Sequence, residues 1–169
     1  RSNEAMLYAY GFATEHNPDD EVTLSLRIGT QTTTFTMRDE GLVTVSSELW
    51  NVLDSMQDGE EKCILSNGGS MHPASLELLE SYLKNKLATL TDTDKRAKEW
   101  IEKVTTNKKR KLYCDKDSML QCATYAGHYR HGLRRIIETV LRDINSELNK
   151  FVESDSDNES KNSVEIDTD

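Results

Sequence analysis

Two histidines lie close to three arginines in the C-terminal half of the chain. His128 and His131 are three residues apart, so on a helix they would share a face and could in principle bind one metal ion. No cysteine or carboxylate at a suitable spacing joins them, and positive charge surrounds them at Arg130, Arg134 and Arg135. We therefore predict no metal site, and instead a helix surface that is solvated or that contacts an acidic patch on a partner or on a part of the protein outside this chain.

The first twenty residues contain a second group with chemical potential. Ser2-Asn3, Tyr10-Gly11-Phe12 and Asn17-Pro18 follow one another at short intervals. An aromatic residue after a glycine is usually a packing feature, so Tyr-Gly-Phe alone would predict no function. In this order and spacing the segment resembles the end of the SET domain in protein methyltransferases of the Rubisco large-subunit methyltransferase class. One difference is Glu4-Ala5, where the family often has Ala-Glu.

The resemblance implies roles in a site for S-adenosyl-L-methionine. Tyr10 would be the catalytic residue of this segment and would line the narrow channel through which a target lysine enters. Gly11 would let the backbone approach the cofactor, and Phe12 would pack against its adenine end. Tyr10 would thus belong to the cofactor site as well. Methyl transfer from a sulfonium to a neutral amine needs alignment more than a strong acid or base, and an aromatic wall favours nearby positive charge.

The resemblance also divides the chain. Residues 1–20 would end a SET domain, 21–151 would form a helical substrate-binding domain that holds a protein substrate, and 152–169 would be an acidic disordered tail. The family's Asn-His cofactor motif and second active-site tyrosine precede this segment and are not in the chain. The intact parent is thus expected to be a protein-lysine N-methyltransferase, and the chain alone is expected to be inactive without the remainder of its SET domain.

Two alternatives stay open. The chain could be a non-catalytic helical module that binds a partner protein through its long helix, or part of a SET-derived protein that has lost activity. The Asn-His motif and the tyrosine upstream would separate the first alternative from the enzyme, and a labelled methyl donor would separate the second.

Composition limits the partners. No apolar run approaches the length of a membrane span, so no membrane association is expected. The net charge is -9, and Glu153–Asp169 contains seven acidic residues and one basic residue, which makes nucleic-acid binding an unfavoured role. The three cysteines, Cys63, Cys114 and Cys122, form no CxxC pair and favour a reducing compartment, the cytoplasm or the nucleus. Lys108–Lys111 resembles a nuclear-localisation cluster but is more typical of a surface loop.

The elements that would position these residues are mostly helical. Ser2 is predicted to cap a short helix over Asn3–Ala9, which Gly11 ends. Residues 22–28 and 33–37 each alternate between apolar and polar types, so they predict a small β-hairpin near the N-terminus, with Phe35 and Met37 facing inward.

The remaining elements are predicted to be helices. Ser46-Ser47-Glu48 starts one, and Pro73 lies in the first turn of another, which continues as a leucine face to Leu90. Thr91 and Asp92 are predicted to cap a separate helix. Core positions are expected for both tryptophans, Trp50 and Trp100.

The clearest element is the last helix. Apolar residues keep helical spacing from about Asp115 to about Lys150, which corresponds to roughly 50 Å of helix. Gly127 and Gly132 interrupt this pattern and predict a kink or a close contact near the middle.

Overall fold

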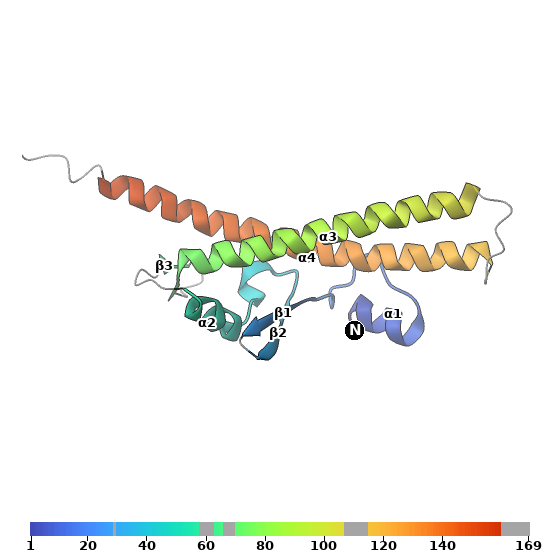
Figure 1. Ribbon diagram of the computed structural model, residues 1–169, viewed down its shortest axis with the longest axis horizontal. Helices are drawn as coiled ribbons and strands as arrows, with labels where there is room; N and C mark the ends of the chain where they lie inside the picture. The colour runs from blue at the N-terminus through green and yellow to red at the C-terminus, as the bar shows by residue number, and fades with distance from the viewer. Residues whose placement is uncertain (29, 58–62, 66–69, 107–114, 160–169) are drawn as a thin grey trace, which may run out of the picture.

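The computed structural model describes residues 1–28, 30–57, 63–65, 70–106 and 115–159. Two long helices, α3 (Pro73–Thr106) and α4 (Lys116–Glu159), lie side by side and form one layer (Figure 1). Helix α1 (Asn3–Tyr10), strands β1 (Val22–Ile28) and β2 (Gln31–Met37) and helix α2 (Ser47–Ser55) lie along one side of this pair. The remaining elements are the 3-10 helix η1 (Gly41–Thr44) and the strands β3 (Cys63–Ile64) and β4 (Ser70–Met71). The predicted mostly helical fold, with an N-terminal hairpin and a long last helix, is confirmed.

The N-terminal hairpin packs its predicted face into the core. Strands β1 and β2 pair antiparallel, with Val22 opposite Met37 and Leu24 opposite Phe35. All four side chains are buried, because period-two alternation places them on the same face of the two strands. The second hairpin, in which β3 pairs with β4, was not predicted from the sequence, and the intervening residues 66–69 lie outside the described residues.

Both short helices begin where their capping residues predict. The Ser2 side chain accepts a hydrogen bond from the backbone N–H of Ala5, and the Ser46 side chain accepts one from Leu49. Gly11 ends α1 with φ 74°, a left-handed conformation that glycine adopts without steric cost.

Helix α3 is continuous, so the prediction of a separate helix starting at Thr91 is wrong. Neither glycine nor proline occurs between residues 74 and 106, and propagating an existing helix costs less than nucleating a second one. The Thr91 hydroxyl donates to the Leu87 carbonyl one turn earlier, at 3.0 Å, instead of capping a new helix.

Helix α4 is longer than predicted. It has 44 residues, which corresponds to about 66 Å. It starts where the Asp115 carboxylate accepts a hydrogen bond from the Ser118 N–H at 2.8 Å. It ends at Glu159, so the predicted disordered tail begins too early at residue 152, and residues 160–169 lie outside the described residues.

The core occupies only part of the helical pair. We call residues 73–90 of α3 with 133–151 of α4 the inner half, and residues 91–106 with 116–131 the outer half. In the inner half, α3 and α4 bury a continuous apolar seam over the hairpin and α2. This seam comprises Leu76, Leu79, Leu83, Leu133, Ile136, Ile137, Val140, Leu141 and Ile144.

The outer half has almost no buried side chain. Val104 is the one residue that the described part of the outer half buries fully. Trp50 is half-buried against the core, as expected, but Trp100 is 38% exposed, so its predicted core position is wrong. The reason is that none of the described elements covers this part of the pair on the side of Trp100. Within the described ranges, no helix has both the length and the apolar character to cross a membrane.

Candidate functional site

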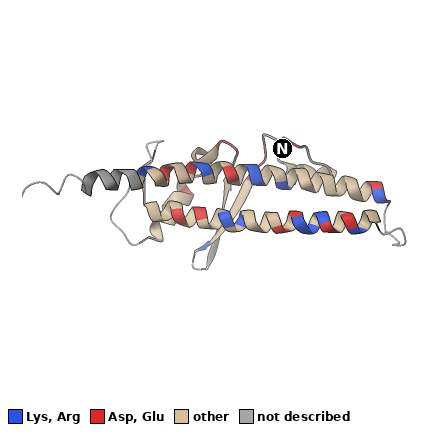
Figure 2. Ribbon diagram, turned by 90° about the horizontal axis from the view of Figure 1, so that it is seen from above, with Lys and Arg blue, Asp and Glu red and all other residues tan. Residues whose placement is uncertain are grey.

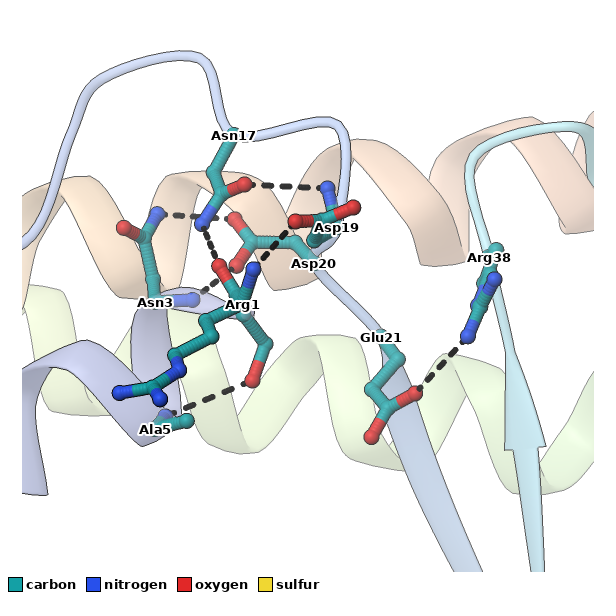
Figure 3. Close-up of polar contacts among 9 residues, drawn as sticks. Arg1, Asn3, Ala5, Asn17, Asp19, Asp20, Glu21 and Arg38 are labelled. Carbon is teal, nitrogen blue, oxygen red and sulfur yellow. Dashed lines mark hydrogen bonds and ion pairs between the residues drawn. The ribbon is translucent and has the colours of Figure 1, made fainter.

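The N-terminal strip, residues 1–20, is closed by a buried asparagine and a buried aspartate. The Asn3 backbone N–H donates to Asp20 Oδ1 at 2.6 Å, and Asn3 Nδ2 donates to Asp20 Oδ2 at 2.9 Å (Figure 3). Asn3 also exchanges hydrogen bonds with the backbone of Thr14, as donor at 2.9 Å and as acceptor at 2.8 Å. Asn3 therefore has a structural role, which accounts for an asparagine directly after the Ser2 cap.

The same aspartate fixes the strip onto α4. A Cβ atom added at Gly132 would lie 2.2 Å from Asp20 Oδ2, so only glycine leaves room for this carboxylate. The sequence predicted a kink or a close helix contact here, and the structure instead places the side chain of a loop residue against the glycine. Gly127, by contrast, faces open space and makes no close contact.

The Asn-Pro loop is also held by its own side chain. Asn17 Nδ2 donates to the Arg1 carbonyl at 2.7 Å, and Asn17 Oδ1 accepts from the Asp19 N–H at 3.0 Å (Figure 3). The second contact is an Asx turn, which the Asn-Pro-Asp sequence favours. Two of the three motifs that carry the resemblance thus build the frame of the strip.

The third motif lies on the surface. Tyr10 is 58% exposed and Phe12 is 39% exposed, and their ring centroids are 6.0 Å apart. Phe12 also meets Tyr125 of α4 edge to face at 6.4 Å. We call Tyr10, Phe12 and Tyr125 the aromatic edge. Gly11 lies between the first two with nothing within 4 Å of its Cβ position, so the backbone here is open to approach.

Helix α1 leaves one apolar face uncovered. Ala5, Tyr8 and Ala9 follow helical spacing and are all exposed, and Tyr8 is 96% exposed. On the rest of the helix Asn3 is buried, and Met6 and Leu7 are half-buried. The face that carries Ala5, Tyr8 and Ala9 therefore contacts little within the described chain.

A cation already rests on the aromatic edge. The guanidinium carbon of Arg1 lies 5.7 Å from the centre of the Tyr10 ring, and Arg1 Nη1 donates to the Tyr10 hydroxyl. The face of this ring and its hydroxyl oxygen can therefore both receive a positively charged group.

The contact between the strip and α4 raises the pKa of one tyrosine. Burial raises the pKa of Tyr129, and the negative charges of Glu4 and Asp20 raise it further. Tyr129 therefore stays a neutral hydroxyl at physiological pH. On the other side of the strip, burial lowers the pKa of Lys86, although Glu4 opposes this, and Lys86 Nζ donates to the Thr23 carbonyl at 2.7 Å.

The arginines beside the two histidines bind within the chain. Arg130 and Arg134 both pair with Asp94 of α3, and Arg134 Nη2 lies 2.8 Å from Asp94 Oδ2. Arg135 pairs with Asp39 at 2.8 Å. Two internal aspartates therefore supply acidic groups to these three arginines, and a contact with an acidic patch outside the chain stays a prediction.

The two histidines do not share a site. His131 is exposed and meets His16 of the strip, with ring centroids 6.4 Å apart, and Arg135 Nη1 lies 3.2 Å from His16 Nδ1. No group of three or more His, Cys, Asp or Glu side chains in the described residues could hold a metal ion.

Reasoning from sequence missed two residues of this region. Neither Asp20 nor Tyr125 was given a role. Asp20 lies in a run of polar residues two positions before the first residue of β1, and such a position gives no signal of a distant glycine partner. A signal for Tyr125 does exist, because it lies in a stretch of α4 without charged residues.

Comparison with protein-family models, with curated proteins and with solved structures found no match to the chain.

Proposed function

We propose that the chain is the C-terminal portion of an S-adenosyl-L-methionine-dependent protein-lysine N-methyltransferase, comprising the end of a SET domain and a helical substrate-binding domain. The observation that carries the proposal is the combination of a rigidly anchored strip with an uncovered aromatic face. Asn3, Asp20 and Gly132 fix the strip, while Tyr10 and Phe12 remain exposed. An exposed apolar face on a short helix is normally covered by another element.

The uncovered face of α1 fits the remainder of a SET domain as its partner. Exposed apolar residues at helical spacing match a surface that is buried against another element in the complete protein. The open backbone at Gly11 and the neighbouring rings fit one wall of a cofactor pocket, in which S-adenosyl-L-methionine would supply the electrophilic methyl group.

Tyr10 would orient the target amine. Its hydroxyl oxygen, which accepts a hydrogen bond from Arg1 in this chain, would accept one from the incoming lysine and direct the nitrogen lone pair toward the methyl group. Phe12 would close the pocket against water, and Tyr125 would hold the Phe12 ring in place. The helical domain would bind the protein substrate, and the cytoplasm or the nucleus is the compartment proposed for the reaction.

The test is methyl transfer from labelled S-adenosyl-L-methionine by the longer protein that contains this chain. Tyr10→Ala is expected to lower the rate at least a hundredfold, because alignment supplies much of the acceleration. Tyr82→Ala is the matched control and is expected to retain most of the rate, because Tyr82 is an exposed tyrosine of α3 that belongs neither to the strip nor to the aromatic edge.

Methylated peptides from cells with and without the longer protein would identify the substrate by mass spectrometry. Equal rates for Tyr10→Ala and the parent protein would contradict the role of Tyr10. Absence of any transfer and of any change in methylated peptides would favour the non-catalytic helical module.

A further inference from the structure

One stretch of α4 differs in composition from the rest of the helical pair. Ser118–Tyr129 contains no Lys, Arg, Asp or Glu, and it appears as continuous tan ribbon beside the alternating colours of α3 (Figure 2). None of its twelve residues is fully buried. An uncharged stretch that forms no core is unusual for a helix otherwise rich in charge, since uncharged faces normally lie against another element.

This stretch forms one wall of an apolar groove of about 660 Å³ in the outer half. Trp100 and Ala97 line it from α3, and Met119, Cys122 and Ala126 line it from α4. Small side chains along the floor let another backbone approach closely, and the partly exposed Trp100 forms a rigid apolar wall. A third helix lying between α3 and α4 would complete a three-helix layer.

The charges beside the groove indicate the chemistry of that helix. Arg96 and Lys103 lie four residues before and three residues after Trp100, so they flank it on the same side of α3. Both are exposed, and neither forms an ion pair with a residue in the described ranges. Arg130, which also lines the groove, forms an ion pair with Asp94, which Arg134 shares.

The net negative charge of the whole chain does not cancel the positive charge of Arg96 and Lys103 beside the groove. At physiological ionic strength, charges more than about 8 Å apart are largely screened, so a bound segment responds mainly to the side chains at the rim. We therefore propose that the groove binds an acidic amphipathic helix of a partner protein. Its bulky apolar residues would lie against Trp100 and Ala126, and its carboxylates would meet Arg96 and Lys103. The proposal does not rest on the methyl-transfer function.

The test uses the full chain and two fluorescein-labelled peptides of about 20 residues, long enough for a 30 Å helix. Both carry leucines at positions i, i+3, i+4 and i+7, and one has glutamates where the other has lysines. Fluorescence anisotropy is expected to show binding of the acidic peptide at least tenfold tighter than of the basic one. Trp100→Ala is expected to weaken binding of the acidic peptide about tenfold, and Trp100→Phe much less. Circular dichroism would verify that both variants fold.

A charge reversal sharpens the test. Replacing Arg96 and Lys103 together by glutamate is expected to reverse the preference between the two peptides. Replacing Lys95 and Lys98 by glutamate is the matched control, since they line a separate polar groove with Asp94 and Glu102. This control makes the same change in net charge and is expected to keep the preference for the acidic peptide.

Equal affinity for the two peptides, no binding of either, or a preference unchanged by the Arg96 and Lys103 reversal would overturn the proposal. Sedimentation of the chain alone gives an independent check. A concentration-dependent dimer that Trp100→Ala abolishes would assign the groove to a second copy of the chain and would also overturn the proposal.

Discussion

The inner and outer halves of the helical pair share the same two helices but differ in what stabilises them. The inner half buries leucine and isoleucine side chains against the hairpin and α2, whereas the outer half fully buries only Val104 among its described side chains. Ion pairs and the strip hold the outer half instead, through Asp94 and through Asp20. One continuous helix can thus be packed into the core at one end and have its side chains exposed to solvent at the other.

The largest effect is expected from removing the same atoms from each half, which tests whether the two halves differ in packing. Ile137→Ala in the inner half is expected to lower the free energy of unfolding by about 3 kcal/mol, because the side chain is fully buried. Ile101→Ala in the outer half removes an identical side chain that is only half-buried, and is expected to cost about 1 kcal/mol. Urea denaturation followed by circular dichroism measures both, and equal losses would mean that the two halves are equally packed.

A smaller effect is expected from the two glycines of α4. Gly132→Ala would force Asp20 away from its hydrogen bonds to Asn3 and is expected to lower the free energy of unfolding by about 1–3 kcal/mol. Gly127→Ala has open space around it and is expected to raise stability by about 0.5–1 kcal/mol, because alanine loses less entropy in a helix.

Urea denaturation of these two variants measures the changes. Amide exchange of α1 would show whether the strip detaches in Gly132→Ala. A loss of stability of the same size at both glycines would mean that Asp20 does not hold the strip.

The smallest effect concerns Asp94. Burial raises the pKa of Asp94, but hydrogen bonds from Arg130 and Arg134 and their positive charges outweigh it, so the pKa lies below its ordinary value. The stabilisation is therefore complete above the unfolded pKa of about 4, and is lost as the pH falls through the lower folded value. Asp94→Asn is expected to cost at most about 1 kcal/mol at pH 6 and less at pH 3.

Urea midpoints of the parent chain and of Asp94→Asn at several pH values between 3 and 6 would check this expectation. Asp92→Asn, an exposed neighbour on α3, is the control and is expected to show no such trend. A difference between parent and Asp94→Asn that grows as the pH falls would have the wrong sign for this ion-pair network.

Local rules predicted the local features of the fold. The Ser2 and Ser46 caps, the alternation in β1 and β2, and Pro73 at the start of α3 each depend on neighbours within a few residues. The same rules misplaced the break at Thr91, because a capping residue has no effect where the helix on both sides continues to propagate.

For long-range contacts, the sequence predicted one of the two partners but not the other. Gly132 signalled a close approach, but the sequence does not say that Asp20 makes it. Trp100 was assigned to the core because large aromatics at helical spacing usually lie there. Chain topology decides whether a third layer covers a helix, and hydrophobic periodicity carries no information about topology. For the same reason the sequence predicted that Tyr10 and Phe12 act together, but not that Tyr125 joins them.

Neither long helix is interrupted where the buried seam stops, and this has a mechanical consequence. Helices α3 and α4 continue from the inner to the outer half without a break, so the outer half is a rigid extension of the packed inner half. A force on the far end of the outer half would therefore displace the outer half as a unit, because neither helix has a hinge at the junction. The strip is attached to α4 at Gly132 and, further along the outer half, through the contact of Phe12 with Tyr125, so a displacement of the outer half would carry Tyr10 with it.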